Sequence, residues 1–217
     1  MKRLLSFLFV CLPMIATAQG LKTEGFSVED LVPKGWEKNI ATGDLNKDGI
    51  DDLVIIATPD IAENMMTRDD GYVFNFNAPI LAIYFGYTDG KFRLWKKYEN
   101  IIEHQVDEYL FIGHEAKITP KGTLQISLEY FASAGTSSSY WNTYTFRYQK
   151  NGFALIGKDE RSLSRYNGED KEVSSNYLTR KSKTTTSNAF NEDIKPKEVW
   201  KTLPKKPLEL LGEFKIE

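Results

Sequence analysis

The chain has 217 residues, of which 41% are hydrophobic and 27% are charged, with 28 basic and 30 acidic residues. This composition supplies enough apolar side chains for the core of one domain of ordinary size. The mildly acidic, mixed-sign charge excludes a broad basic surface, so we expect no nucleic-acid partner.

The first eighteen residues have the pattern of an export signal. Lys2 and Arg3 precede an apolar run from Leu4 to Ile15, and Ala16-Thr17-Ala18 fits a signal-peptidase site. About twelve apolar residues are too few for a membrane span, which needs about twenty, so we expect no transmembrane segment. We therefore predict cleavage near Ala18 and a periplasmic or extracellular location for the remainder.

Cys11 is the single cysteine of the chain and lies within this apolar run. After cleavage the protein would contain no thiol, which excludes disulfides, cysteine nucleophiles and thiolate metal sites. A lipoprotein signal ending at Cys11 is the alternative form of export, although the bulky Val10 before the cysteine fits such a signal poorly.

The segment from Gly43 to Ile56 carries oxygen donors at alternate positions of a short loop. Positions 1, 3, 5, 7 and 9 of this loop are supplied by Asp44, Asn46, Asp48, the Ile50 carbonyl and Asp52. Hard oxygen donors at this spacing suit Ca²⁺, which takes about six to eight oxygens. Gly49 permits the sharp turn that aims them at one point. We predict a structural Ca²⁺ site at these five residues, with Asp51 facing solvent.

The residues after this loop distinguish two kinds of calcium site. An EF-hand would need a bidentate carboxylate at position 12 and a helix after it. Position 12 is instead Ile55, within the β-branched run Leu53–Ile56, which predicts a buried strand. Trp36–Ala41 is the expected strand before the loop, and Pro59 ends the strand after it.

A calcium loop that leads into a strand resembles the FG-GAP repeat of integrin α-type β-propellers. The repeat would occur once, over about residues 34–98. The resemblance implies one blade-like unit with a calcium ion at a strand-connecting loop. A looser likeness extends along the chain to small secreted bacterial proteins with a single such repeat, and it implies no particular activity.

The rest of the chain predicts a series of antiparallel hairpins. Asp60–Pro79 has no regular period and is expected to be a long surface loop. Turn signals then separate apolar, alternating runs, which are Ile80–Phe85, Phe92–Tyr98, a run ending near Ile118, Thr123–Tyr130, Tyr144–Gln149 and Phe153–Ile156. The charged stretch Arg161–Glu172 is expected to be a loop. Asn176–Thr186 and Val199–Trp200 are weaker strands, and Pro207–Phe214 is an apolar closing segment.

These patterns predict an all-β fold, mostly an antiparallel β-meander with one propeller-blade-like unit. Residues 19–217 would form a single β-domain. A short β-propeller and a two-sheet sandwich are the alternative architectures.

Two further groups of residues could carry a function. His104 and His114 are the two histidines of the chain, and their ten-residue spacing without an HExxH pattern argues against a zinc site. Five aromatic residues surround the Ser-rich turn at residues 132–139 and could form a platform for sugars or peptides, although strand packing explains them equally well. They are Tyr130, Phe131, Tyr140, Trp141 and Tyr144.

The sequence thus predicts an exported calcium-binding β-domain that acts as a binding or structural module for a protein or glycan partner. The alternative is a secreted hydrolase in which His104 or His114 acts with a carboxylate of the segment after Pro59.

Overall fold

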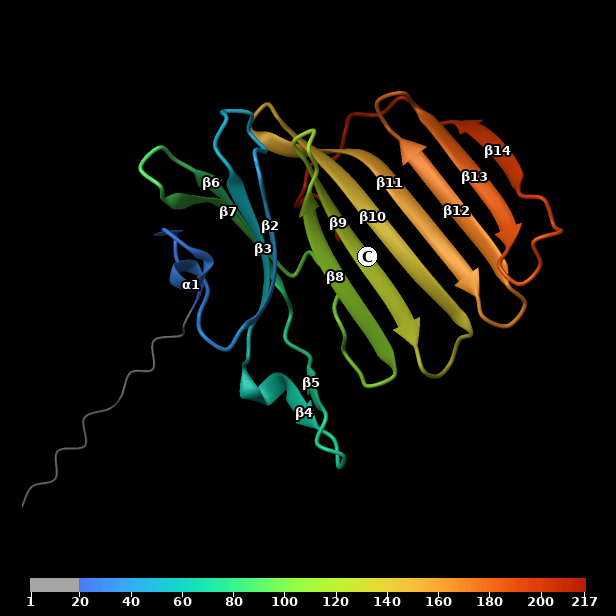
Figure 1. The fold of residues 1–217 in the computed structure, drawn as a ribbon, viewed down its shortest axis with the longest axis horizontal. Helices are drawn as coiled ribbons and strands as arrows, with labels where there is room; N and C mark the ends of the chain where they lie inside the picture. Colours follow the sequence, from blue (N-terminus) through green and yellow to red (C-terminus); the bar gives the residue numbers. More distant parts are fainter. Residues whose placement is uncertain (1–19) are drawn as a thin grey trace, which may run out of the picture.

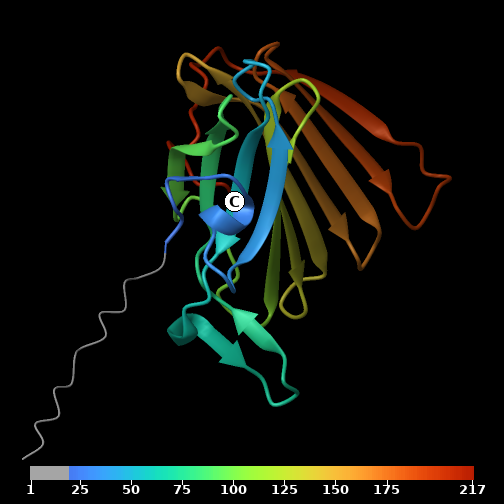
Figure 2. The same cartoon turned by 60° about the vertical axis from the view of Figure 1, so that its left-hand side comes forward.

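The computed structural model describes residues 20–217, which form two antiparallel sheets and one small hairpin (Figures 1 and 2). The all-β prediction is confirmed, because strands make up the regular structure apart from two short helices. The predicted export signal at residues 1–18 lies outside the described residues. Within the described part, no helix is long and apolar enough to cross a membrane.

The first sheet has five strands in the order β1-β7-β6-β3-β2, all antiparallel to their neighbours. Its strands are β1 (Glu24–Gly25), β2 (Glu37–Gly43), β3 (Asp52–Thr58), β6 (Ile80–Gly86) and β7 (Phe92–Glu99). The four longer strands form a meander that coincides with the range 34–98 expected for the blade-like unit.

Both faces of this sheet are covered, which explains why its central strands are so apolar. Val54 and Ile56 of β3 point into a core shared with the second sheet, whereas Leu53 and Ile55 point into a smaller cluster on the other side. Successive side chains of a strand alternate between its faces, so a strand buried on both sides needs an unbroken hydrophobic run. β3 is accordingly buried along its whole length.

The smaller cluster is closed by the segment before β2. The helix α1 (Val28–Leu31) begins with a capping box, in which Ser27 and Asp30 each accept from the backbone amide of the other, at 3.3 and 3.2 Å. Leu31 and Trp36 then pack against Leu53 and Tyr84. A four-residue helix is too short to produce a helical period in the sequence.

The second sheet is a continuous meander of seven strands in the order β14-β13-β12-β11-β10-β9-β8. They are β8 (Leu110–Ile118), β9 (Thr123–Ala132), β10 (Ser138–Gln149), β11 (Gly152–Ser164), β12 (Glu169–Asn176), β13 (Lys181–Asn188) and β14 (Lys197–Thr202). In the described residues this sheet is not divided into blades, so the short β-propeller alternative is wrong.

The two sheets meet beside β2 and β8, where the Ala116 amide donates to Asn39 Oδ1 at 2.7 Å. Side chains from both sheets fill one core, which includes the fully buried Ile83 and Phe146. The closing segment adds Leu211 to this core, as its apolar pattern predicts, and Ile216, which follows that segment, is buried there as well. β12, β13 and β14 extend beyond the first sheet and are largely polar (Figures 1 and 2).

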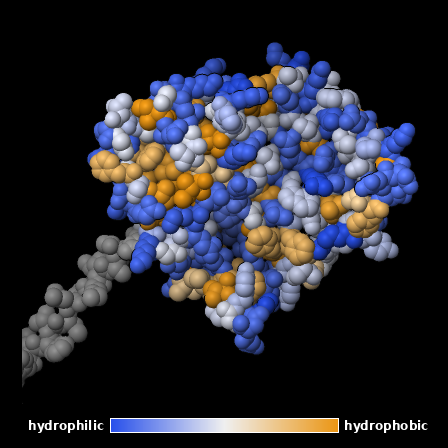
Figure 3. All heavy atoms as spheres, in the orientation of Figure 1, coloured by the Kyte–Doolittle hydropathy of each residue, from blue (hydrophilic) through white to orange (hydrophobic). Residues whose placement is uncertain are grey.

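Two segments expected to be loops contain regular structure. The segment Asp60–Pro79 contains η1 (Ala62–Asn64), β4 (Met65–Thr67) and β5 (Val73–Asn75), which form a hairpin that projects from the body (Figures 1 and 2). Its exposed apolar or aromatic residues include Met65, Tyr72 and Val73. Hydrophobic atoms are visible at the bottom of the molecule in Figure 3, where this hairpin lies.

The second such segment is Arg161–Glu172, where β11 continues to Ser164 and β12 begins at Glu169. The loop prediction was wrong because both faces of these strands are largely solvated. A strand without a buried face needs no hydrophobic alternation, so its sequence resembles that of a loop.

The shared core generates a direct test of the two-sheet packing. Because the Phe146 side chain is fully buried, Phe146→Ala should lower the free energy of unfolding by about 3–5 kcal/mol. Tyr166, an aromatic residue that is 85% exposed, is the matched control. Tyr166→Ala should change the free energy of unfolding by less than about 0.5 kcal/mol. Urea denaturation measures both, and equal losses would contradict this packing.

Candidate metal centre

The predicted calcium loop connects β2 to β3 and is followed by a strand, as its sequence indicates. Asp44 and Asn46 are half-buried, Asp48 is exposed, and Asp52 is fully buried at the start of β3. Asp51 is exposed, as expected. The loop is therefore accessible to solvent on one side and anchored in the protein on the other.

Asp44 organises the first half of the loop. Its Oδ1 accepts from the Lys47 and Asp48 amides at 2.6 and 3.2 Å, and its Oδ2 accepts from the Gly49 amide at 2.9 Å. Asn46 Oδ1 accepts from the Asp48 amide at 2.9 Å. These bonds wrap the backbone around the Asp44 carboxylate, since Asp and Asn side chains can replace a backbone acceptor in a turn.

Asp48 extends this network toward the second half of the loop. Its Oδ2 accepts from Asn46 Nδ2 at 2.9 Å and its Oδ1 from the Ile50 amide at 2.8 Å. The side chains of Asn46 and Asp48 are therefore neighbours. Burial is the main cause of the raised pKa of Asp52, and the Asp48 charge adds a smaller contribution in the same direction.

Asp52 anchors the loop to the sheet. Its Oδ2 accepts from the Leu45 and Asn46 amides at 2.8 and 3.2 Å, and its Oδ1 accepts from the Gly86 amide at the end of β6 at 3.0 Å. Burial raises the pKa of this carboxyl, and the three amide bonds act in the opposite direction. A nearby cation would favour the ionised carboxylate further.

The loop also contacts the second sheet. A Cβ on Gly122, in the turn between β8 and β9, would lie 2.6 Å from the Asp44 carbonyl oxygen, and Gly122 has a φ of +68°. A Cβ on Gly86 would lie 2.2 Å from the Asp51 carbonyl oxygen. Both positions therefore require glycine, because the loop backbone passes too close for a side chain. The loop lies where the two sheets approach one another.

The side-chain oxygens that would bind a cation already accept hydrogen bonds, and these bonds can be counted. Asp44 and Asp52 each accept three N–H groups, Asp48 accepts two, and Asn46 Oδ1 accepts one. An ionised carboxylate offers about four acceptor sites and an amide oxygen about two. Each of the four side chains thus keeps at least one acceptor site that no N–H group occupies, and its oxygen is of the hard type that Ca²⁺ prefers.

Carboxylates alone do not complete this centre. Among residues 20–217, no group of three or more His, Cys, Asp or Glu side chains is placed to hold a metal ion. A cation in the loop would therefore also depend on the Asn46 amide oxygen and the Ile50 carbonyl, which are the neutral members of the predicted set.

The two histidines, which are ten residues apart in sequence, line one cleft. This cleft has a volume of about 220 Å³, and Glu37, Tyr72 and Asn75 also line it. In the described part of the chain neither imidazole has a hydrogen bond or an ion pair, and His114 Nδ1 is a buried atom without a partner. The cleft therefore brings both imidazoles near one carboxylate, Glu37, without a hydrogen bond between them in the described residues.

The aromatic residues around the turn at 132–139 divide between the two faces of the second sheet. Tyr144 is buried in the shared core, and Tyr130 and Tyr140 line a cavity on the same face. Trp141 lies on the opposite face, with the Arg161 guanidinium 5.2 Å from its ring centroid. The sequence placed these residues near one turn but did not separate the faces, which only the strand register decides.

Asp52 should be needed for stability even without a metal. Asp52→Asn replaces one acceptor oxygen by an NH₂ group that faces backbone donors, so it should lower the free energy of unfolding by about 2–4 kcal/mol. Asp51→Asn, at the exposed neighbouring position, should change it by less than about 0.5 kcal/mol. Urea denaturation in the presence of a chelator compares the two variants, and equal stabilities would contradict the anchoring role.

The His114 cleft predicts a dependence of stability on pH. Burial, and secondarily the nearby His104, lower the pKa of His114 below its ordinary value of 6.5. The folded state therefore favours the neutral imidazole of His114. The stability that this neutral group contributes is fully present above the unfolded-state pKa of 6.5, and it is lost as the pH falls through the lower pKa of the folded state.

Unfolding experiments at pH 7.5 and 5.5 should show that His114→Gln reduces this loss. His104→Gln should retain most of it, because it removes only the smaller, like-charge cause. An identical pH dependence in the wild type and His114→Gln would contradict the assignment.

Comparison of the chain with models of protein families, with curated proteins and with solved structures found no match.

Proposed function

We propose that this chain is an exported β-protein in which the Asp44–Asp52 loop binds Ca²⁺ and fastens the ends of the two sheets. The supporting observation is the donor set, in which every predicted ligand side chain keeps a free acceptor site while backbone amides hold its carboxylates in place. The resemblance of the segment to an FG-GAP repeat is consistent with this function.

The backbone amides reduce the cost of assembling such a site. Asp44 and Asp52 are both fixed by three hydrogen bonds, so little side-chain freedom remains to be lost when a cation binds. The exposed Asp48 is the member that can adjust its position. Ca²⁺ tolerates irregular geometry and oxygen ligands of mixed type, which suits a set of carboxylate, amide and carbonyl oxygens.

A bound cation would offset the negative charges of the three loop carboxylates. Asp44, Asp48 and Asp52 lie in one nine-residue loop, and the Asp48 charge disfavours ionisation of Asp52. A bound divalent cation reverses the sign of this interaction. Because the loop touches the end of β6 and the β8–β9 turn, the gain should appear as stability of the whole fold and not of the loop alone.

Calcium should therefore raise the melting temperature. At a free concentration one hundred times the Kd, a single site stabilises the folded state by about 2.7 kcal/mol. For a protein of this size, such a gain corresponds to a rise of about 5–10 °C. Thermal unfolding followed by circular dichroism, with calcium or with a chelator, measures the difference.

Paired variants test whether the loop is responsible. Asp48→Ala should abolish the calcium response, and Asp51→Ala, one of the nearest acidic positions outside the ligand set, should retain it. Calorimetric titration should give one calcium per chain for the wild type and none for Asp48→Ala. A melting temperature that does not respond to calcium, or an equal loss of response in Asp51→Ala, would overturn the proposal.

A further inference from the structure

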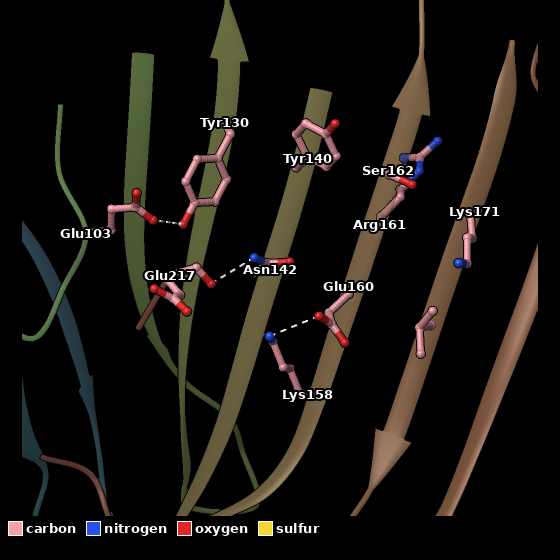
Figure 4. Close-up of a pocket in the computed structure, with 11 residues that line it drawn as sticks. Glu103, Tyr130, Tyr140, Asn142, Lys158, Glu160, Arg161, Ser162, Lys171 and Glu217 are labelled. Atoms are coloured by element: carbon pink, nitrogen blue, oxygen red, sulfur yellow. Dashed lines mark hydrogen bonds and ion pairs between the residues drawn. The ribbon is translucent and has the colours of Figure 1, made fainter. Parts of the chain in front are cut away.

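Two cavities of this molecule differ in whether their polar groups are already paired. The cavity of about 580 Å³ on the second sheet is lined by three acidic and three basic residues (Figure 4), namely Glu103, Glu160, Glu217, Lys158, Arg161 and Lys171. Lys158 pairs with Glu160 at 3.0 Å. The Tyr130 hydroxyl donates to Glu103 at 2.8 Å. Because its charges offset one another, this cavity shows no preference for a ligand of either charge.

The cleft that His104 and His114 line, which we call the histidine cleft, has an unbalanced charge. It lies between the base of the β4–β5 hairpin and the start of β8, and Glu37 is the carboxylate in its lining. No lysine or arginine of the described residues lines it. Glu37 is exposed and forms no ion pair within residues 20–217. Its negative charge is therefore available to a cation.

The imidazoles add free hydrogen-bond acceptors to this carboxylate. A neutral imidazole has one acceptor nitrogen, and within residues 20–217 neither His104 nor His114 makes a hydrogen bond. Burial lowers the pKa of His114, so this imidazole is neutral at pH 7. Its Nδ1 is a buried atom without a partner, and a buried polar atom in that state is costly until a ligand or water pairs with it.

The amide donors of the lining are already used by the protein. Asn75 Nδ2 donates to the Pro59 carbonyl at 2.9 Å, and Asn77 Nδ2 donates to the Ile61 carbonyl at 3.0 Å. The Gln105 side-chain amide donates to a backbone carbonyl at 2.8 Å. The two asparagine bonds also fix the base of the hairpin, so one wall of the cleft is preformed. The cleft therefore offers a ligand acceptors and negative charge more than donors.

Aromatic rings form the apolar part of the histidine cleft. Tyr72 and Phe111, which are 55% and 48% exposed, line it together with the buried Phe74. Arg68 lies 5.9 Å from the ring centroids of Tyr72 and Phe74, but it pairs with Asp70 and is not part of the lining. The cleft volume of about 220 Å³ is below the about 300–1,000 Å³ of sites for drug-sized ligands, so the cleft suits a molecule with one ring.

We propose that the histidine cleft binds a small organic cation, a primary amine that carries a single apolar ring. The ammonium group, which has three N–H donors, would pair with Glu37 and donate to the free acceptor nitrogens of His104 and His114. The ring would lie against Tyr72 and Phe111, because aromatic side chains supply rigid contact area. The unpaired carboxylate, the free acceptors and the exposed rings together carry this assignment.

A transition metal is the other ligand that two imidazoles and a carboxylate could take. Among residues 20–217, no three such side chains are placed to hold a metal ion, so the geometry favours a ligand that forms separate hydrogen bonds. The proposal concerns residues outside the Asp44–Asp52 loop. It and the calcium proposal can therefore fail independently.

NMR titration of isotope-labelled protein with phenethylamine in calcium-free buffer tests the proposal. The backbone amide signals of Asn75, Gly113 and His114 should shift and saturate at millimolar amine. Phenethyl alcohol, which has the same ring and chain without the charge, should bind about fivefold more weakly. Hydrocinnamate, which carries a negative charge on a similar frame, should not shift these signals. Amine binding should weaken as salt is added, because Glu37 is exposed.

Paired variants show whether the named side chains are responsible. Glu37→Gln keeps the shape of the side chain and removes its charge, so it should weaken binding about threefold to fivefold. Glu115, an exposed acid next to His114 on β8, points to the opposite face, and Glu115→Gln should leave binding unchanged. Tyr72→Ala should weaken binding about threefold to tenfold, and Tyr166→Ala should have no effect.

Three results would overturn the proposal. They are unshifted signals at millimolar amine, equal binding of phenethyl alcohol or hydrocinnamate, and an equal effect of Glu115→Gln and Glu37→Gln. If Zn²⁺ shifts the same signals and the amine does not, the cleft is a metal site instead. Circular dichroism verifies that each variant is folded.

Discussion

The buried carboxylate of Asp52 is the constraint on which one end of this molecule depends. Its two oxygens accept backbone amides from the loop after β2 and from the end of β6, so three strands of the first sheet are related through one side chain. A buried ionisable group is costly unless it is hydrogen-bonded, and here every bond comes from a backbone donor. The loop shape is therefore fixed by the protein itself, and a cation would act on a loop already in place.

The packing of the two sheets explains why the molecule has two kinds of surface. The first sheet is covered on both faces, by the shared core and by the α1 segment, and it leaves few side chains free for a ligand. The second sheet has seven strands and the first has five, so β12–β14 extend beyond the first sheet. The face of the second sheet that is apolar at the core is therefore solvated along these three strands. Figure 2 shows the second sheet continuing beyond the first, and the strands that extend there are largely polar.

Sequence reasoning succeeded where a strand has at least one buried face. Strands β2, β3, β6, β7 and β9 were predicted closely, because alternation or an apolar run marks each of them. It failed at Arg161–Glu172, where two solvated strands resemble a loop, and at Asp60–Pro79, where a short hairpin projects from the body. It therefore also missed that Ser162 and Lys171 face each other across β11 and β12, because this register depends on strand pairing.

The sequence by itself determined the local chemistry: the oxygen donors of the loop, the glycine that turns it and the buried strand that follows, because these depend on spacing within one short segment. Only the tertiary structure decided which groups from distant segments meet. It placed the Gly86 amide on Asp52, both histidines in one cleft, and Tyr140 and Lys171 in the lining of one cavity. Strand pairing and sheet packing set these neighbours, and such long-range contacts leave no periodic signal in a single sequence.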